Sequence, residues 1–241
     1  MRKATSVRTV TTLVVALLVI SATTVACAQA TWEGPTGVFL NPLALNLAQG
    51  KVAASVHYLN LQPVGGLTTY GLAYGAFDNF EIGLTRADLS AGGLTSIDIL
   101  HAKYVWAGHG GIPNLALGAI VRDTEGSGGA LTNDFYLAAT KIFPAKTPVI
   151  ASVTVRNTNG LGSGLFGKDT ERSFQLGAFL GVQATPKLIV GAEVYDQPQA
   201  DAWLDLAARY IASPNTFVDV GLARINDAFD NQFAVAVTQV F

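Results

Sequence analysis

The chain has 241 residues, half of them hydrophobic and only 13% charged, with a formal net charge of −2. Without the first 30 residues, which hold three basic and no acidic side chains, 12 basic residues stand against 17 acidic ones and the net charge is −5. This balance argues against a nucleic-acid partner, because no basic surface is available to neutralise phosphates. After residue 30, no apolar run reaches the roughly 18 residues of a helical span. The apolar composition therefore predicts strands.

The amino terminus has the three parts of a secretory signal. A basic start is followed by an apolar core and a small-x-small cleavage site: Arg2, Lys3 and Arg8, then 13–20, then Ala28-Gln29-Ala30. We predict a cleaved signal peptide over 1–30, which leaves Thr31 as the mature terminus. The alternative is an uncleaved helical anchor, because residues 9–26 carry no charge and approach the length of a span. Six Ser and Thr residues in that stretch favour cleavage.

Residues 51–241 show the period-two alternation of strands. Near the end, Phe233, Val235 and Val237 alternate with small or polar residues. The same pattern predicts twelve strands, over 51–61, 67–77, 80–89, 95–107, 114–123, 133–143, 147–157, 173–184, 187–196, 201–211, 216–225 and 231–241.

The connections between these strands alternate in length. Every second link is tight and rich in turn residues, whereas the others are longer and polar, with 123–132 and 157–172 the longest. Outer-membrane barrels have short periplasmic turns and long outer loops. A soluble β-sandwich gives no reason for this alternation. We therefore predict an all-β, antiparallel up-and-down transmembrane barrel of about twelve strands in the bacterial outer membrane, with both termini periplasmic.

Two segments resemble known barrels. The end of the chain, with Phe233, Val235, Val237 and a terminal Phe241, resembles the signal by which the outer-membrane assembly machinery recognises its substrates, although Gln239 departs from the pattern. The opening of the mature chain is similar to that of YjbH-type barrels associated with exopolysaccharide secretion. The residues that carry this second resemblance are Gly34-Pro35-Thr36-Gly37-Val38, Pro42-Leu43-Ala44 and Gly50.

Parity assigns one face of each strand to lipid and the other to the lumen. The outward set is apolar, with Leu72 and Leu84 as examples, and outer-membrane lipid and lipopolysaccharide are the expected neighbours. Arg86 and Arg224 share this outward parity and either meet lipid phosphates or are solvated at the barrel mouth. The inward set is small or polar, so a barrel of this size has space to fill.

The inward ionisable residues are the candidate selectivity residues. They are Glu81, His101, Lys103, Glu193, Asp205, Arg209 and Asp219, with Arg122 and Arg156 near the outer rim. A three-residue loop at 213–215 would make Arg209 and Asp219 direct cross-strand neighbours. These charges either satisfy one another across a wet lumen or form a selectivity constriction.

Residues 31–50 have two possible places. They form a periplasmic arm that leads to the barrel, or they plug its lumen. Their apolar side chains favour the arm, because a polar lumen is a poor partner for an apolar segment. The arm or plug over 31–50 and the barrel over 51–241 complete the predicted domains.

No enzymatic constellation is evident. Ser55 and His57 share a face, but no carboxylate near them in the sequence suggests a triad. The only cysteine is Cys27, and we expect it to leave with the signal peptide; the alternative is a lipidation site, which the preceding Thr24-Val25-Ala26 disfavours. No His/Cys/Asp cluster has metal-ligand spacing. We therefore expect no cofactor or metal.

The sequence favours a passive or weakly cation-selective channel for small hydrophilic solutes. Acidic residues outnumber basic ones in the inward set, and a narrow passage focuses that potential. The alternative is a non-conducting accessory barrel, for which the exopolysaccharide resemblance is the reason.

Overall fold

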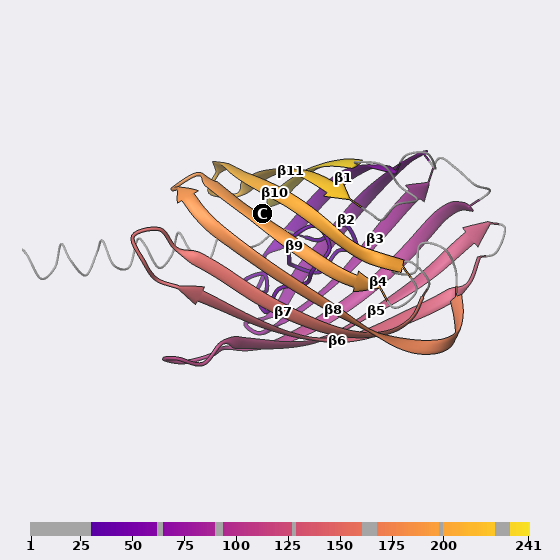
Figure 1. Ribbon diagram of the computed structural model, residues 1–241, viewed down its shortest axis with the longest axis horizontal. Coiled ribbons are helices and arrows are strands. Elements are labelled where there is room, and N and C mark those ends of the chain that lie inside the picture. Colours follow the sequence, from indigo (N-terminus) through magenta and orange to yellow (C-terminus); the bar gives the residue numbers. More distant parts are fainter. Residues whose placement is uncertain are drawn as a thin grey trace, which may run out of the picture.

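The computed structural model describes residues 30–61, 65–89, 94–126, 129–160, 168–197, 200–224 and 232–241. These residues form one closed ring of antiparallel strands, in which sequence neighbours pair and β1 closes on β12 (Figure 1). The strands are β1 Val52–Leu61, β2 Gly65–Phe77, β3 Phe80–Leu89, β4 Leu94–Trp106, β5 Asn114–Gly126, β6 Leu131–Phe143, β7 Val149–Gly160, β8 Lys168–Thr185, β9 Leu188–Gln197, β10 Ala200–Ser213, β11 Thr216–Arg224 and β12 Gln232–Val240. The predicted all-β barrel of twelve strands is confirmed. Among the described residues, no helix is long and apolar enough to cross a membrane.

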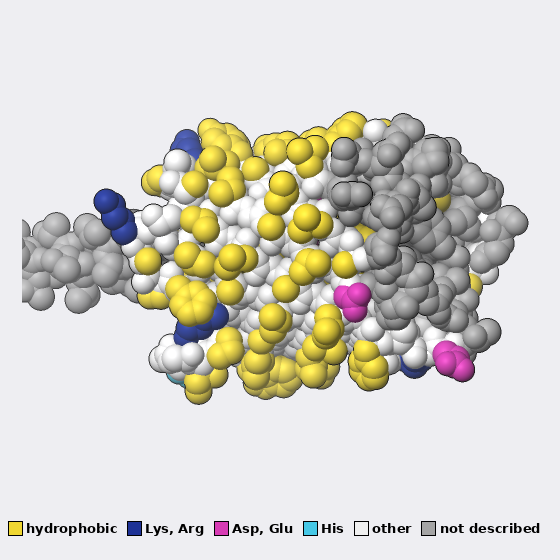
Figure 2. Space-filling model, viewed as in Figure 1, with side chains coloured by type: hydrophobic (Ala, Val, Ile, Leu, Met, Phe, Trp, Pro, Cys, Tyr) yellow, Lys and Arg dark blue, Asp and Glu magenta, His cyan; other side chains and the backbone are white. Residues whose placement is uncertain are grey.

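Alternation along each strand produces the two faces of the wall. Leu72 on β2 and Leu84 on β3 are 58% and 62% exposed, whereas their sequence neighbours Ala73 and Thr85 are buried. Outward hydrophobic side chains form a band over the middle of the barrel, and charged side chains gather toward its ends (Figure 2). A surface of this kind suits lipid rather than water.

The two ends of the barrel differ. At one end, which we call the turn end, neighbouring strands are joined through Asp78–Asn79, 186–187 and 214–215. At the other end, the loop end, the strands run further than the sequence indicated. β5 and β6 leave only 127–130 between them, and β7 and β8 leave 161–167. The two longest predicted loops are therefore partly strand, because polar residues continue the pairing beyond the apolar band.

Residues 30–50, which we call the lumen segment, lie inside the ring of strands. Their indigo trace runs within the barrel in Figure 1, and Trp32, Phe39, Leu43 and Leu47 are each at most 2% exposed. The segment contains bridges between Ala30 and Thr36 and between Gly37 and Pro42, but no named strand. The structure thus differs from the favoured expectation of a periplasmic arm. The physical reason is that the wall supplies polar partners for the segment's backbone and apolar partners for its side chains.

Glycines on the inward face make room for this segment. A Cβ added to Gly221 would lie 2.8 Å from the Phe39 ring, and one added to Gly75 would lie 2.8 Å from the Leu47 carbonyl oxygen. A Cβ on Gly177 would collide with the Asn41 side chain. Beside Val38, a remaining cavity holds about 20 Å³, room for roughly one water molecule. At these positions, small inward residues leave space that the segment fills.

Candidate functional site

Glu81 and Lys103 hold the middle and the end of the lumen segment. The Glu81 carboxylate accepts hydrogen bonds from the Thr36 amide at 2.7 Å, the Thr36 hydroxyl at 2.5 Å and the Leu47 amide at 3.2 Å. The Lys103 ammonium lies 3.0 Å from Glu81 and donates to the carbonyl oxygens of Thr36 and Leu43. The ion pair is buried and binds the segment through the backbone of Thr36, Leu43 and Leu47 and through the Thr36 hydroxyl.

Glu193 on β9 holds the next part of the segment. Its carboxylate accepts from the amides of Leu40 and Asn41, both at 3.0 Å, and from the Asn41 side-chain amide at 2.9 Å. Directly across the sheet, β10 places Asp205 opposite Glu193. Two carboxylates in such a pair destabilise a sheet. The three donors from the segment bind the Glu193 carboxylate and so stabilise this part of the wall in the presence of the segment.

Arg209 on β10 and Asp219 on β11 are direct cross-strand neighbours, as the sequence predicted. Their charged groups are 3.1 Å apart, and Arg209 also donates to the Gly37 carbonyl oxygen at 3.1 Å. The turn is tighter than expected, because Ser213 already pairs with Thr216. An irregularity between Ile211 and Ser213 restores the predicted register.

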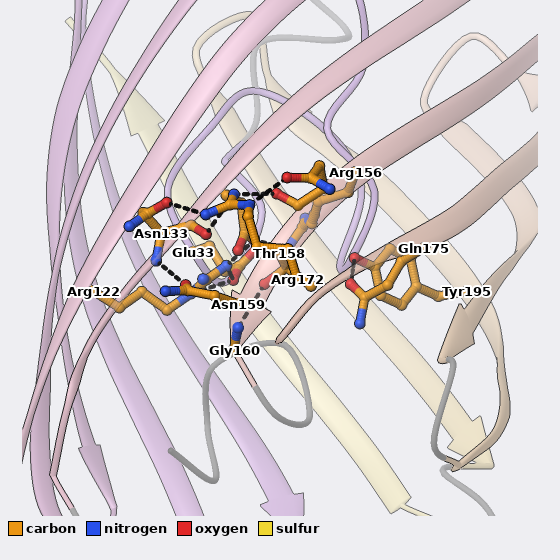
Figure 3. Close-up of polar contacts among 12 residues, drawn as sticks. Glu33, Arg122, Asn133, Arg156, Thr158, Asn159, Gly160, Arg172, Gln175 and Tyr195 are labelled. Atoms are coloured by element: carbon orange, nitrogen blue, oxygen red, sulfur yellow. Dashed lines mark hydrogen bonds and ion pairs between the residues drawn. The ribbon is translucent and has the colours of Figure 1, made fainter. Parts of the chain in front are cut away.

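The lumen segment contributes one carboxylate to the site, that of Glu33. It lies among Arg122 on β5, Asp134 on β6 and Arg156 on β7, and we call these four residues the Glu33 cluster. Figure 3 labels Glu33, Arg122 and Arg156. One Glu33 oxygen accepts hydrogen bonds from two nitrogens of Arg122, from Nε at 2.8 Å and from Nη2. The other oxygen accepts a hydrogen bond from Arg156 at 2.9 Å. Asp134 accepts from the same two guanidinium groups at 2.6 and 3.0 Å. Two cations and two anions are thus paired in a site that is no more than 1% exposed.

Tyr195 contacts the Glu33 cluster through Arg156. The Arg156 guanidinium lies 5.2 Å from the centre of the Tyr195 ring, which suits a cation–π contact. The Tyr195 hydroxyl and Gln175 are hydrogen-bonded at 2.5 Å (Figure 3). In the part of the chain that the structure describes, no three His, Cys, Asp or Glu side chains are arranged to hold a metal ion.

All seven predicted selectivity residues point inward and are buried. Four of them bond directly to the lumen segment: Glu81, Lys103, Glu193 and Arg209. His101 lies beside it, because a Cβ added to Gly34 would sit 2.6 Å from the His101 Nδ1 atom. Arg122 and Arg156, placed near the outer rim by the sequence, are enclosed by Glu33 and Asp134. Their role in selectivity stays a prediction.

Sequence reasoning missed two members of the Glu33 cluster. Asp134 follows the alternation of β6, in which Phe135 points outward, so parity could have found it. Glu33 lies in the segment that we expected to form a periplasmic arm outside the barrel. This segment has no regular alternation from which a partner of Glu33 could be predicted.

On the outward face, Arg86 is paired rather than free. It is half exposed and forms an ion pair with Asp98 at 2.9 Å. The side chain of Arg224, the other expected outward cation, lies outside the described residues. An outward ion pair of this kind leaves little of the Arg86 charge for lipid phosphates.

The residues of the predicted assembly signal lie at the closure of the barrel. Phe233, Val235 and Val237 point outward. Phe241 is 65% exposed, and its backbone exchanges hydrogen bonds with Val52 on β1, at 2.8 and 3.4 Å. Recognition of this terminus by the assembly machinery stays a prediction.

Comparisons with solved structures show what this fold is similar to. The KdgM porin matches with a TM-score of 0.60 and 11% identity, over 78% of this chain and 99% of that one. The NanC porin matches with a TM-score of 0.55 and 8% identity, over 78% and 98%. Outer membrane protein Omp33 of Acinetobacter baumannii matches with a TM-score of 0.50 and 13% identity, over 80% and 98%. At identities this low, the comparisons show similarity of the fold alone.

Comparisons with sequences identify the family. No curated protein matches the chain. The resemblance of the opening segment to YjbH-type barrels stays a prediction. The family model described as "Protein of unknown function (DUF3034)" matches residues 27–226. Since this match runs from the predicted signal cleavage region through β11, the chain belongs to the DUF3034 family, with a barrel of the outer-membrane porin fold.

Proposed function

We propose that this protein is an outer-membrane channel for small hydrophilic solutes, and that the lumen segment closes it at rest. The porin fold supports this, as does the solved "KdgM porin in complex with disordered oligogalacturonate", which matches with a TM-score of 0.57 and 10% identity. In this proposal both termini are periplasmic, the assembly machinery inserts the barrel, and the loop end faces outward. The chain carries out transport rather than catalysis.

One observation carries the proposal: the polar lining that a solute would meet is bonded to the lumen segment. Among the described residues, nine backbone groups of the segment are hydrogen-bonded to inward side chains of the wall. Water can replace such bonds in a polar lumen. The hydrogen bonds between strands do not involve the segment, so the ring can persist when the segment leaves.

In the open state we expect a weak preference for cations. Histidines aside, the buried ionisable residues of the described wall are five carboxylates and four cations. The carboxylates are Glu81, Asp134, Glu193, Asp205 and Asp219, and the cations are Lys103, Arg122, Arg156 and Arg209. A small negative excess in a narrow aqueous passage favours cations.

A reversible lock tests the closure. The Cγ atom of Asn41 lies 2.9 Å from the position of a Cβ on Gly177. In an Asn41→Cys/Gly177→Cys pair the sulfur introduced at position 41 would take the place of this Cγ atom, and in a disulfide each sulfur lies about 3 Å from the Cβ of the other cysteine, so the pair suits a disulfide. We expect almost no current through the oxidised protein in a planar bilayer and clear openings after reduction, in a Cys27→Ser background. The reversal potential across a salt gradient then gives the selectivity.

The single variants Asn41→Cys and Gly177→Cys are the controls, and their currents should not respond to reductant. Equal currents through the oxidised and reduced double variant would show that the lumen segment does not close the channel.

A non-conducting accessory barrel is the second candidate, and the filled lumen favours it. It predicts no current from the reduced double variant or from a chain that lacks 31–47, although both form the barrel. Current through either variant would remove this candidate.

A further inference from the structure

We propose that Arg122 and Arg156 form a binding site for the carboxylate of an acidic solute, and that Glu33 occupies this site in the closed state. A solute carboxylate then competes with Glu33 and favours release of the lumen segment. This inference rests on the proposed function and names the solute class that the same lumen would recognise.

Glu33 is bound in the way that a carboxylate ligand is bound. Glu33 is the only charged residue within 30–50. Each of its two oxygens is held by a different guanidinium group, as Figure 3 shows. Paired guanidinium groups are well suited to carboxylate recognition. The wall thus holds a carboxylate site whose present ligand belongs to a separate, non-strand segment.

A positive charge remains in the cluster when Glu33 leaves. Asp134 stays between Arg122 and Arg156, because it belongs to the wall. The three remaining residues carry two positive charges and one negative charge. The site without Glu33 therefore has a net positive charge that one further anionic group would neutralise. This local excess is compatible with a weak cation preference of the whole lumen, which depends on the sum of all inward charges.

Several hydrogen-bond donors of the two arginines are not used by Glu33. Within the described chain, three nitrogen atoms of the two arginines have no hydrogen-bond partner: Nη1 of Arg122, and Nε and Nη2 of Arg156. The two side chains are nevertheless at most 1% exposed. The buried hydroxyl of Tyr136 also has none. Buried donors normally find partners. A solute with hydroxyl groups beside its carboxylate would offer these donors more hydrogen-bond acceptors than Glu33 does.

The Glu33 cluster lies toward the loop end of the barrel. Arg122 and Arg156 each lie four residues before the loop end of their strands, which end at Gly126 and Gly160. The contacts of the segment with Glu81 and Gly75 lie toward the turn end. A solute that enters from the loop end would therefore meet the Glu33 cluster before it meets the rest of the segment.

Equilibrium dialysis of the purified full-length protein in detergent tests this inference. The probe is radiolabelled glucuronate, with glucose as the neutral control and chloride salt to keep the ionic strength constant. A closed state populated at about 90% weakens apparent affinity about tenfold. We therefore expect Glu33→Gln, which removes the competing carboxylate, to bind glucuronate at least about tenfold more tightly than the wild type.

Two further variants make the test specific. Glu33→Gln/Arg156→Gln should lose glucuronate binding. Glu33→Gln/Arg209→Gln should keep it, because Arg209 also contacts the segment but lies outside the Glu33 cluster. Trp32 provides a second measurement. In a Trp106→Phe/Trp203→Phe background, glucuronate should shift Trp32 emission to the red, and glucose should not.

The inference is overturned if Glu33→Gln and the wild type bind glucuronate equally, or if binding survives the loss of Arg156. It is also overturned if glucose binds as well as glucuronate. The redox lock tests the proposed function without any acidic solute. A lock that works together with no glucuronate binding to Glu33→Gln would therefore refute only the carboxylate site.

Discussion

Glu33 connects two strands that share no hydrogen bonds with each other, because its carboxylate bridges Arg122 on β5 and Arg156 on β7. Removing one member of a buried ion pair costs about 3–5 kcal/mol, mostly because the remaining charge stays buried without compensation. The side chain of a single residue therefore makes a large contribution to the closed state.

We predict that Glu33→Gln frees the lumen segment and leaves the wall folded. Arg122 and Arg156 then share only Asp134, and hydration of the arginines becomes more favourable than enclosure. Hydrogen exchange followed by mass spectrometry should show faster exchange over 31–47 and unchanged exchange in the strands. The control is Glu125→Gln, an exposed residue on the outward face. Equal exchange in Glu33→Gln and the wild type would contradict a role for this carboxylate in closure.

Gly177 tests whether steric fit holds the segment. In Gly177→Ala, the new methyl group displaces the Asn41 side chain, which donates to Glu193. We expect chymotrypsin to cut near Phe39 in the detergent-solubilised variant and not in the wild type. Gly111→Ala is the matched control, because a Cβ at Gly111 has nothing within 4 Å. Resistance of Gly177→Ala to the protease would mean that the segment adjusts without leaving.

At the scale of elements, the strands follow from the sequence and the lumen segment does not. Alternation gave all twelve strands, and parity gave the Arg209–Asp219 pair, because the period of two constrains every residue of a wall with one apolar face. The segment has no such period. Its place depends on long-range partners, such as Glu193, which is 153 residues from Leu40.

The lumen is not uniformly polar. The wall also presents Ile150, Phe179 and Ile189, which pack with Val38 and Leu43 of the segment, and this is why an apolar segment is stable there. Local sequence shows which wall residues point inward. It does not show which of them gather into an apolar patch, because that depends on the stagger of strands around the ring.

The end of β12 provides the third prediction. Phe241→Ala keeps the backbone hydrogen bonds with Val52 and removes an exposed ring. We expect a severalfold lower amount in the outer membrane, with the same thermal stability for the fraction that assembles. Gln239→Ala, which changes a residue that departs from the assembly pattern, is the control. A normal amount of Phe241→Ala in the membrane would show that the terminal ring is not read during assembly.

The barrel as a unit is closed: within the described strands no edge is left unpaired, since β1 pairs with both β2 and β12. Closed barrels resist detergent because each strand is paired on both sides. We predict different migration of unboiled and boiled protein on a denaturing gel. Identical migration, together with solubility after lysis without detergent, would contradict a membrane barrel.

The short connection between the lumen segment and the wall sets the scale on which solutes act. Gly50 bonds to Gly75 at 2.8 Å, and β1 begins two residues later, so a released segment remains attached at the turn end. A ligand on a short flexible tether has an effective concentration on the order of millimolar. Glu33 behaves as such a ligand for Arg122 and Arg156, so a weakly binding free acid must be present at comparable concentration to replace it. The length of this tether therefore sets the solute concentration at which the barrel opens. A longer connection at 48–51 would lower that concentration.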